Sequence, residues 1–313
     1  MGGEGRCRGI RQAPFDRCLA HLGDELPHVL SVLSPGADID VRGTSFTEHL
    51  LQQLLTALTP DRPEQPPKVG RADFAQARFT GEAGFRNAVF GGAIFQNAEF
   101  DGEGQFEGVR FDGDADFEGA RFGGDAVFRF AEFSGNAHFA GARFADRAHF
   151  DGTQFGWIAG FVRAQFVGTA SFGGAKFSNG GAWFDFAQFG GDLRFEAAEL
   201  SGPAGFRDVH FGGDARFHGA AFYDGAWFIE ACFTKDALFG EVRFSKDSGF
   251  SHAQFKEQAR FESAEFTGDA RFDSATFTKN ARFDGAVFSN GVRCHRRWPR
   301  ANALGRPDNL RWR

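Results

Sequence analysis

Residues 111–122 read FDGDADFEGARF, with phenylalanines six and then five residues apart. The same pattern extends in both directions along the chain. From Phe74 to Phe288 an apolar anchor recurs 40 times, and it is Phe in every case except Leu200. The gaps between anchors are 5 residues long in 21 cases, 6 in 17 cases and 7 in one. Because five-residue and six-residue gaps mostly alternate, the repeating unit contains one gap of each length.

Each anchor is preceded, two positions earlier, by a small residue that is usually Ala, so the unit reads A-x-F. An apolar residue on either side of a variable one is the alternation expected of a β-strand. The variable residue is often charged, as in Arg121, Glu132 and Arg143, and we expect it to face solvent while Ala and Phe face the core. A helix is excluded because steps of 5 and 6 residues would place successive phenylalanines about 140° and 240° around its axis.

The gaps also locate the turns. A long gap typically reads F-x-G-D-A-x-F, which places the extra residue in a turn dipeptide. If long and short gaps alternate, only a coil with an even number of sides places long corners above long corners. A coil of four sides contains two five-residue gaps and two six-residue gaps. Forty anchors then predict about ten coils and a rod roughly 48 Å long, at about 4.8 Å per coil. The predicted core includes Phe117, Phe122, Phe128, Phe133, Phe139 and Phe144.

This A-x-F repeat resembles the pentapeptide-repeat family over about residues 71–291. The resemblance implies an all-β solenoid, a right-handed, four-sided parallel β-helix with Phe stacked in its interior. The chain departs from a strict five-residue pattern by an extra residue at every second corner. We therefore expect two opposite corners to bulge while the faces stay intact. Both ends of such a solenoid need caps.

The sequence predicts four parts: a helical N-terminal region or cap over 1–59, a Pro-rich linker over 60–70, the β-helix over 71–291, and a basic tail or cap over 292–313. The segment Ser45-Phe46-Thr47-Glu48 has the pattern of a capping box and predicts a helix over about 46–58. Its leucine stripe is expected to plug the open end of the Phe stack, with a partner helix or dimer contact as the alternative. A shorter helix is predicted over about 25–33, capped by Asp24.

Cys7, Cys18 and His21 form the spacing C-x10-C-x2-H. Two thiolates and an imidazole are zinc ligands, but structural zinc sites need four, and His28 is the only nearby candidate for the fourth. The alternative interpretation is two small buried cysteines and a surface histidine. Zinc at this place is the only cofactor that the sequence suggests.

A second set of polar residues recurs once per expected coil at one corner: Asp192, Asp214, Asp236, Gln258 and Asn280. In a four-sided coil these residues form one column, about 5 Å apart. Stacked carboxylates repel one another and could recruit a cation. The alternative is that each Asp serves its own turn.

Signatures of enzymes are missing from the sequence. It has no P-loop, H-E-x-x-H, G-x-S-x-G or C-x-x-C motif. The outward-facing side chains of His138 and His149 are expected to be solvated. We therefore expect no catalysis and no small-molecule substrate. No stretch is apolar enough to span a membrane, no secretion signal is visible, and four Cys indicate a reducing compartment. These features predict a cytoplasmic protein, and the resemblance to the pentapeptide-repeat family implies one of bacterial type.

Three functions are compatible with this sequence. The first is a rigid scaffold whose faces dock an unknown protein partner, because the exterior varies while the interior is monotonous. The second comes from the resemblance, which implies a DNA mimic that modulates DNA gyrase or topoisomerase IV; a net charge of −10 over residues 71–291 argues against it. The third is attachment to nucleic acid or a membrane surface through the tail, which holds seven Arg, Trp298 and Trp312. A homodimer through one end of the rod is a further expectation.

Overall fold

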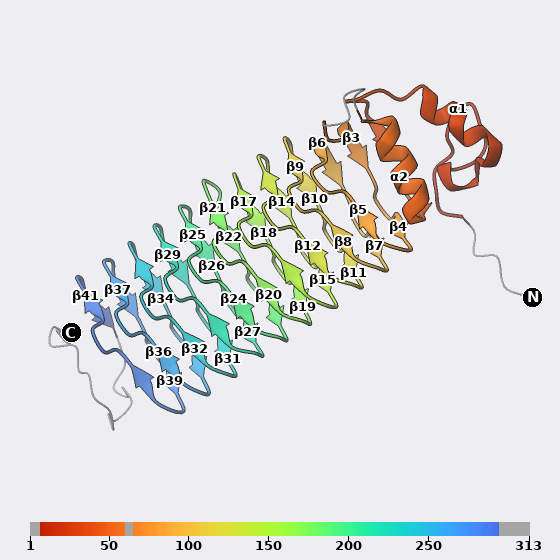
Figure 1. Cartoon of the computed structure of the whole chain (residues 1–313). Helices are drawn as coiled ribbons and strands as arrows, with labels where there is room; N and C mark the ends of the chain where they lie inside the picture. The colour runs from red at the N-terminus through yellow and green to blue at the C-terminus, as the bar shows by residue number, and fades with distance from the viewer. Residues whose placement is uncertain (1–6, 60–64, 294–313) are drawn as a thin grey trace, which may run out of the picture.

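Short strands stack into a four-sided solenoid with the helices at one end (Figure 1). This computed structural model describes residues 7–59 and 65–293. Each A-x-F unit supplies one strand, and every pairing is parallel and joins equivalent positions of consecutive coils, as Ala115 pairs with Ala137 and Phe122 with Phe144. The predicted fold class is confirmed: the chain is a four-sided parallel β-helix of about ten coils.

The four faces are numbered here in the order in which the chain visits them. Face 1 contains β1 (Ile39–Asp40), the C-terminal halves of β3 (Lys68–Asp73) and β6 (Val89–Ile94), β10 (Ala115–Asp116), β14 (Ala137–His138), β18 (Ala159–Gly160), β22 (Ala182–Trp183), β26 (Ala204–Gly205), β30 (Ala226–Trp227), β34 (Ser248–Gly249), β38 (Ala270–Arg271) and β42 (Val292–Arg293). Face 2 contains β2 (Ser45–Phe46), β4 (Arg78–Phe79), β7 (Glu99–Phe100), β11 (Arg121–Phe122), β15 (Arg143–Phe144), β19 (Gln165–Phe166), β23 (Gln188–Phe189), β27 (His210–Phe211), β31 (Cys232–Phe233), β35 (Gln254–Phe255) and β39 (Thr276–Phe277).

Face 3 contains β5 (Ala83–Gly84), β8 (Gly104–Gln105), β12 (Ala126–Val127), β16 (Ala148–His149), β20 (Ala170–Ser171), β24 (Leu193–Arg194), β28 (Ala215–Arg216), β32 (Ala237–Leu238), β36 (Ala259–Arg260) and β40 (Ala281–Arg282). Face 4 contains the N-terminal halves of β3 and β6, β9 (Arg110–Phe111), β13 (Glu132–Phe133), β17 (Gln154–Phe155), β21 (Lys176–Phe177), β25 (Glu199–Leu200), β29 (Ala221–Phe222), β33 (Arg243–Phe244), β37 (Glu265–Phe266) and β41 (Val287–Phe288).

Four ladders of phenylalanine rings fill the interior. Within a ladder, rings of consecutive coils lie parallel, as for Phe117 and Phe139, whose centroids are 4.9 Å apart at an interplanar angle of 4°. Between ladders the rings meet edge to face, as for Phe117 and Phe128 at 5.3 Å and 89°. Both are favourable arrangements of aromatic rings. The six phenylalanines of the predicted run from Phe117 to Phe144 are at most 1% exposed.

One coil departs from this packing. Leu200 takes the place of a Phe on face 4, and Leu193 takes the place of an Ala on face 3. The ring of Phe195 lies parallel to Phe177 of face 4, at 5.7 Å and 8°, but is tilted by 39° against Phe172 of its own face. The larger Leu193 and the smaller Leu200 therefore displace Phe195 toward the volume that a Phe at position 200 would fill.

The corners are of two lengths: a five-residue gap forms a short corner and a six-residue gap forms a long one. At a short corner the backbone N–H of the Ala donates to the carbonyl of the preceding Phe, as from Ala120 to Phe117 at 3.0 Å. The second residue after the Phe is left-handed, as at Gly119 with φ of 66°. Long corners follow faces 2 and 4 and are diagonally opposite. We call them the 2–3 corner and the 4–1 corner after the faces that they join.

Both irregular gaps of the repeat lie at the 4–1 corner. Between Phe90 and Phe95 the extra residue is missing, and β6 runs unbroken from face 4 to face 1. Between Phe177 and Phe184 there is one residue more than usual. On either side of both places, Ala still pairs with Ala of the next coil. The corner therefore absorbs the change in length and the faces keep their register.

The N-terminal region covers the first coil. Its helices are η1 (Leu19–His21), η2 (Gly23–Glu25), α1 (Leu26–Ser31) and α2 (Glu48–Ala57). The leucine stripe of α2 is buried in the same hydrophobic cluster as the phenylalanines, as expected for a plug at this end (Figure 1). The helix predicted over 25–33 is shorter, and it follows Glu25 without a side-chain cap, so Asp24 as its cap is wrong.

The prediction that Ser45 caps the second helix is also wrong. Thr47 is the N-cap, and its Oγ1 accepts a hydrogen bond from the N–H of Leu50 at 3.2 Å. Ser45 lies in β2, which stays extended because Phe46 continues a ring ladder and stacks on Phe79 at 5.2 Å and 12°. Phe46, which lies outside the repeat in sequence, is thus part of the core.

Strand pairing also crosses the predicted linker, because β1 pairs with β3 and β2 with β4. The division of the chain into four parts stays a prediction. Residues 60–64 of the linker, and the basic tail from residue 294 with Trp298 and Trp312, lie outside the described residues. Among the helices of the described part, none has the length and hydropathy of a membrane span.

Candidate interaction surface and metal centre

The predicted corner column lies along the 2–3 corner, one residue per coil, because the strands that follow it pair in register. Asp192 Oδ1 accepts the backbone N–H of Asp214 at 3.0 Å. Asp236 Oδ1 accepts that of Gln258 at 3.2 Å. Arg216 lies 3.5 Å from Asp192 and 3.1 Å from Asp214. Asp192 and Asp236 therefore serve the turn of the next coil, and Asp214 pairs with Arg216 of its own coil. Among the described residues, the column does not gather three ligand atoms around one point.

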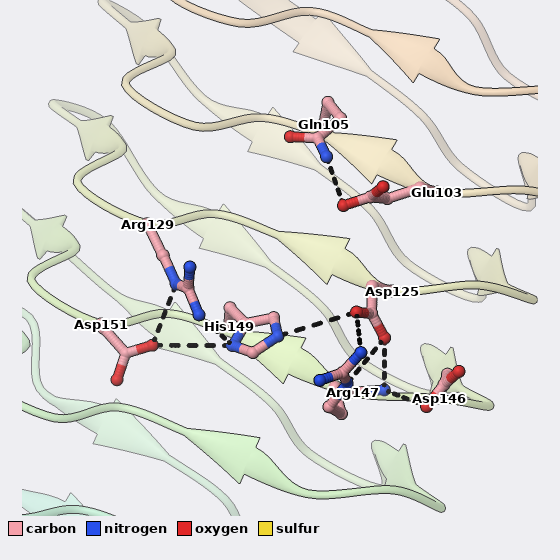
Figure 2. Close-up of polar contacts among 8 residues, drawn as sticks. All are labelled: Glu103, Gln105, Asp125, Arg129, Asp146, Arg147, His149 and Asp151. Atoms are coloured by element: carbon pink, nitrogen blue, oxygen red, sulfur yellow. Dashed lines mark hydrogen bonds and ion pairs between the residues drawn. The ribbon is translucent and has the colours of Figure 1, made fainter.

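Face 3 carries an ion-pair network centred on His149, which lies between Asp125 and Asp151 (Figure 2). Its ring nitrogens are 3.9 Å and 3.8 Å from these carboxylates, and Arg129 Nη2 is 3.1 Å from His149 Nδ1. Burial opposes ionisation of Asp151, but hydrogen bonds with His149 and Ser171 and the charges of His149 and Arg129 outweigh it and lower its pKa. The expectation that His149 is solvated is wrong, because its side chain is only 16% exposed between charged neighbours. The network ties consecutive coils together.

Face 1 and its two corners carry a different surface, which we call the aromatic strip. It consists of Trp157, Ile158, Trp183, Phe186, Tyr223, Trp227 and Ile229. Four of its members are strongly exposed: Trp157 56%, Ile158 39%, Phe186 41% and Tyr223 44%. All three Trp of the described chain and the single Tyr of the sequence belong to it. Exposed apolar patches of this kind mark interaction sites.

Two indoles form the centre of the strip and lie flat on the rod. A Cβ added at Gly225 would stand 1.7 Å from the ring of Trp227, so the glycine is required for this close approach. Trp183 lies against Gly205 in the same manner, and its Nε1 donates to the carbonyl of Gly180 at 3.3 Å. Both indoles are half-buried, and the glycines leave room for their rings against the backbone.

The strip is uncharged along its centre. The outward residues of face 1 over five coils are Gly160, Trp183, Gly205, Trp227 and Gly249. In the corresponding coils the outward residues of face 3 are Ser171, Arg194, Arg216, Leu238 and Arg260. Face 1 therefore presents aromatic and glycine residues where the opposite face 3 presents Arg side chains, of which Arg216 is paired with Asp192 and Asp214.

Phe186 sits in strained backbone at the edge of the strip. Its φ is 63°, in the left-handed region that Gly or Asn occupies with less strain, and it nevertheless exposes its ring. The guanidinium of Arg163, one coil earlier, lies 5.3 Å from the ring centroid. Phe130 is the one other Phe in such a position in the described chain, with φ of 55° and 63% exposure, but it lies at the corner between faces 3 and 4.

The predicted metal ligands come together at the N-terminal end. Cys7 Sγ is 3.1 Å from Cys18 Sγ, which is 3.0 Å from His21 Nδ1. Cys18 is 3% exposed, whereas Cys7 is exposed. Burial, and then the hydrogen bond with Cys7, raises the pKa of Cys18 to about 11. His28 is not part of this cluster and instead contacts Phe15 edge to face.

The repeat itself identifies the chain's relatives. A family model for pentapeptide repeats, nine copies in length, matches residues 69–110, 106–154, 150–199, 195–243 and 250–296. The chain belongs to the pentapeptide-repeat family. A solved structure of trypsin-treated QnrB1, described as a plasmid-mediated fluoroquinolone resistance protein, is 16% identical, covering 72% of this chain and 91% of that one with a TM-score of 0.17. At this TM-score the likeness adds nothing to the argument. A comparison with curated proteins gives no match.

The aromatic strip of this pentapeptide-repeat protein was visible in its sequence only through the coil length. Trp183 and Trp227 are two coil lengths apart, so they must share a face. Phe130 and Phe186 also stand outside the spacing of the anchors. No prediction from the repeat had placed these four residues, which face outward.

Proposed function

We propose that this pentapeptide-repeat protein is a non-enzymatic interaction scaffold, a rigid rod that docks a protein partner on face 1. The observation that carries the proposal is the exposed aromatic strip on a rod whose opposite face carries paired charged side chains. Aromatic residues dominate the energetics of protein interfaces, and rigid ones lose little conformational entropy on binding. Trp183 and Trp227 are held flat by the glycine backbone, so the surface is organised before a partner arrives.

Phe186 supports the same proposal from its backbone. A bulky side chain at positive φ costs stability, on the order of 1 kcal/mol or more. The equivalent residue is left-handed in the other coils as well, where it is Gly119 or Gly141 but also a polar residue such as Arg163 or Asp208. Phe186 is the only Phe, Tyr or Trp at this position in the described coils, and its exposed ring extends the strip at its edge.

The test is a comparison of Phe186→Gly and Trp227→Ala with the wild-type full-length chain. Each protein is immobilised, and the partner recovered by the wild type from native lysate is then titrated against all three. We expect each substitution to weaken binding at least about tenfold, as for a central interface aromatic. Phe186→Gly is expected to be at least as stable as the wild type, so that weaker binding is not explained by misfolding.

Phe130→Gly is the matched control, because it makes the same change at the same type of corner but away from the strip. It should leave binding unchanged. Equal binding by the wild type, Phe186→Gly and Trp227→Ala would contradict the assignment of face 1. Loss of binding in Phe130→Gly alone would move the docking surface to the corner between faces 3 and 4.

A DNA mimic acting on DNA gyrase or topoisomerase IV is the weaker alternative. The charge of −10 over residues 71–291 compares with roughly 28 phosphate charges on a duplex about 48 Å long. Corner carboxylates are also bound by Arg side chains and by backbone N–H groups, as at Asp192 and Asp214. Inhibition of gyrase supercoiling by the full-length chain would reverse this preference. Attachment through the basic tail, a dimer at one end and a cytoplasmic location remain predictions.

A further inference from the structure

Three soft or borderline donor atoms converge at the N-terminal end of the rod, far from the aromatic strip in sequence. The Sγ atoms of Cys7 and Cys18 and a ring nitrogen of His21 all lie within 4.8 Å of one another. Among the residues that the structure describes, no other His, Cys, Asp or Glu side chains gather in this way. Neither thiol of this pair is in a disulfide.

The local backbone explains why these residues meet. Cys18 is the N-cap of η1 and His21 is its last residue. In a 3₁₀ turn, positions i and i+3 lie above one another, so the thiol and the imidazole share one side. A Cβ added at Gly9 would stand 2.6 Å from Cys18 Cβ and 2.9 Å from its Sγ. Only glycine at this position lets the segment that carries Cys7 approach so closely.

The segment that carries Cys7 is fixed against the first coil. The N–H of Ile10 donates to the carbonyl of Arg42 at 3.0 Å, and a Cβ added at Gly43 would stand 2.2 Å from the carbonyl oxygen of Arg8. Leu19, which follows Cys18, and Leu22, which follows His21, belong to the hydrophobic core cluster. The three donors therefore join two pieces of the cap that are each anchored to the rod.

We propose that Cys7, Cys18 and His21 bind one zinc ion, with the fourth position open to water on the exposed side of Cys7. Two thiolates and one imidazole select zinc over the hard cations Mg²⁺ and Ca²⁺. Three protein ligands with water in the fourth position is the coordination pattern of catalytic zinc sites. Here the same pattern would hold two segments of the cap together in place of the four protein ligands of a structural site. Binding releases the two thiol protons, and the ion then fastens the segment of Cys7 to η1.

The test uses the full-length chain, purified under reducing conditions and incubated with zinc or with cobalt(II). We expect one zinc per chain by metal analysis of the native protein, and thiolate-to-cobalt absorption with cobalt(II). Cys7→Ser, Cys18→Ser and His21→Gln should each lower zinc affinity by at least about 100-fold. His21→Cys keeps a ligand at this position and should restore binding.

Two matched variants separate this site from incidental thiol or imidazole binding. Cys232→Ser removes the other described free cysteine, which lies on face 2, and His28→Gln removes the histidine outside the cluster. Both should leave one zinc per chain. Circular dichroism of every variant checks that the β-helix is intact. The proposal is overturned if the reduced wild type binds neither metal, or if Cys7→Ser and Cys18→Ser bind as tightly as the wild type.

Discussion

At the scale of single residues, the core tolerates a substitution only when a neighbour compensates for it. Leu193 and Leu200 both depart from the repeat within one coil, and the ring of Phe195 turns toward face 4 between them. Protein interiors are packed as densely as organic crystals, so volume lost on one face must be filled from another. These three residues therefore behave as one packing unit.

The coupling of Leu193 and Leu200 can be measured. Leu193→Ala should destabilise the chain by about 2–5 kcal/mol, because it leaves a cavity that Phe195 does not fill. Leu200→Phe should cost about 1–3 kcal/mol, because Phe195 occupies part of the volume that the new ring needs. The double variant restores the repeat, so its cost in urea unfolding should be well below the sum of the single costs. Additive costs would show that the three residues pack independently.

At the scale of elements, periodicity predicted the strands, and local motifs misplaced the start of a helix. The A-x-F spacing was sufficient for the four faces because each inward Phe meets another Phe one coil away. The capping box was misleading because Ser45 to Glu48 has the pattern of a helix start, whereas Phe46 is drawn into the ring ladder by Phe79, which lies beyond α2 and the linker in sequence. Such a long-range contact is not visible in a local motif. His149 was misjudged for the same reason, since Asp125 and Arg129 beside it come from the preceding coil.

The two hydroxyls at the start of α2 provide a direct test of this correction. Thr47→Ala removes the observed cap and should cost about 1 kcal/mol. Ser45→Ala is the control, because Ser45 is exposed in β2, and it should change stability by less than about 0.5 kcal/mol. Thermal unfolding followed by circular dichroism at helix wavelengths measures both. A larger loss of stability for Ser45→Ala than for Thr47→Ala would show that Ser45, and not Thr47, caps α2.

At the scale of the whole molecule, one coil consists of two similar halves. Each half contains one short and one long corner and two A-x-F sides, so the interior repeats after every half although the coil closes only after both. The exterior does not repeat in this way, because the aromatic strip occupies face 1 and its two corners but not the opposite face 3. The core therefore determines the rod, and the choice of outward residues determines its surface.

Removing half a coil should leave the rod intact and divide the strip. Deletion of residues 190–200 joins Phe189 to Phe206 through a six-residue gap, as at other 2–3 corners, and moves Trp227 to the face opposite Trp183. We expect a folded β-helix by circular dichroism and loss of partner binding. Deletion of residues 190–211 removes a whole coil, keeps both Trp on one face and should retain more binding. Equal binding by the two deletions would show that face 1 is not the docking surface.

The 4–1 corner has a consequence for how such a chain changes over time. It has accommodated both a missing residue, after Phe90, and an added one, after Phe177, and Ala still pairs with Ala on either side. This corner borders the aromatic strip. Insertions and deletions there can reshape the rim of a partner's footprint without moving a ring of the core. The edge of the proposed docking face is thus where a lineage can explore new partners, and where a loop of foreign sequence can be grafted.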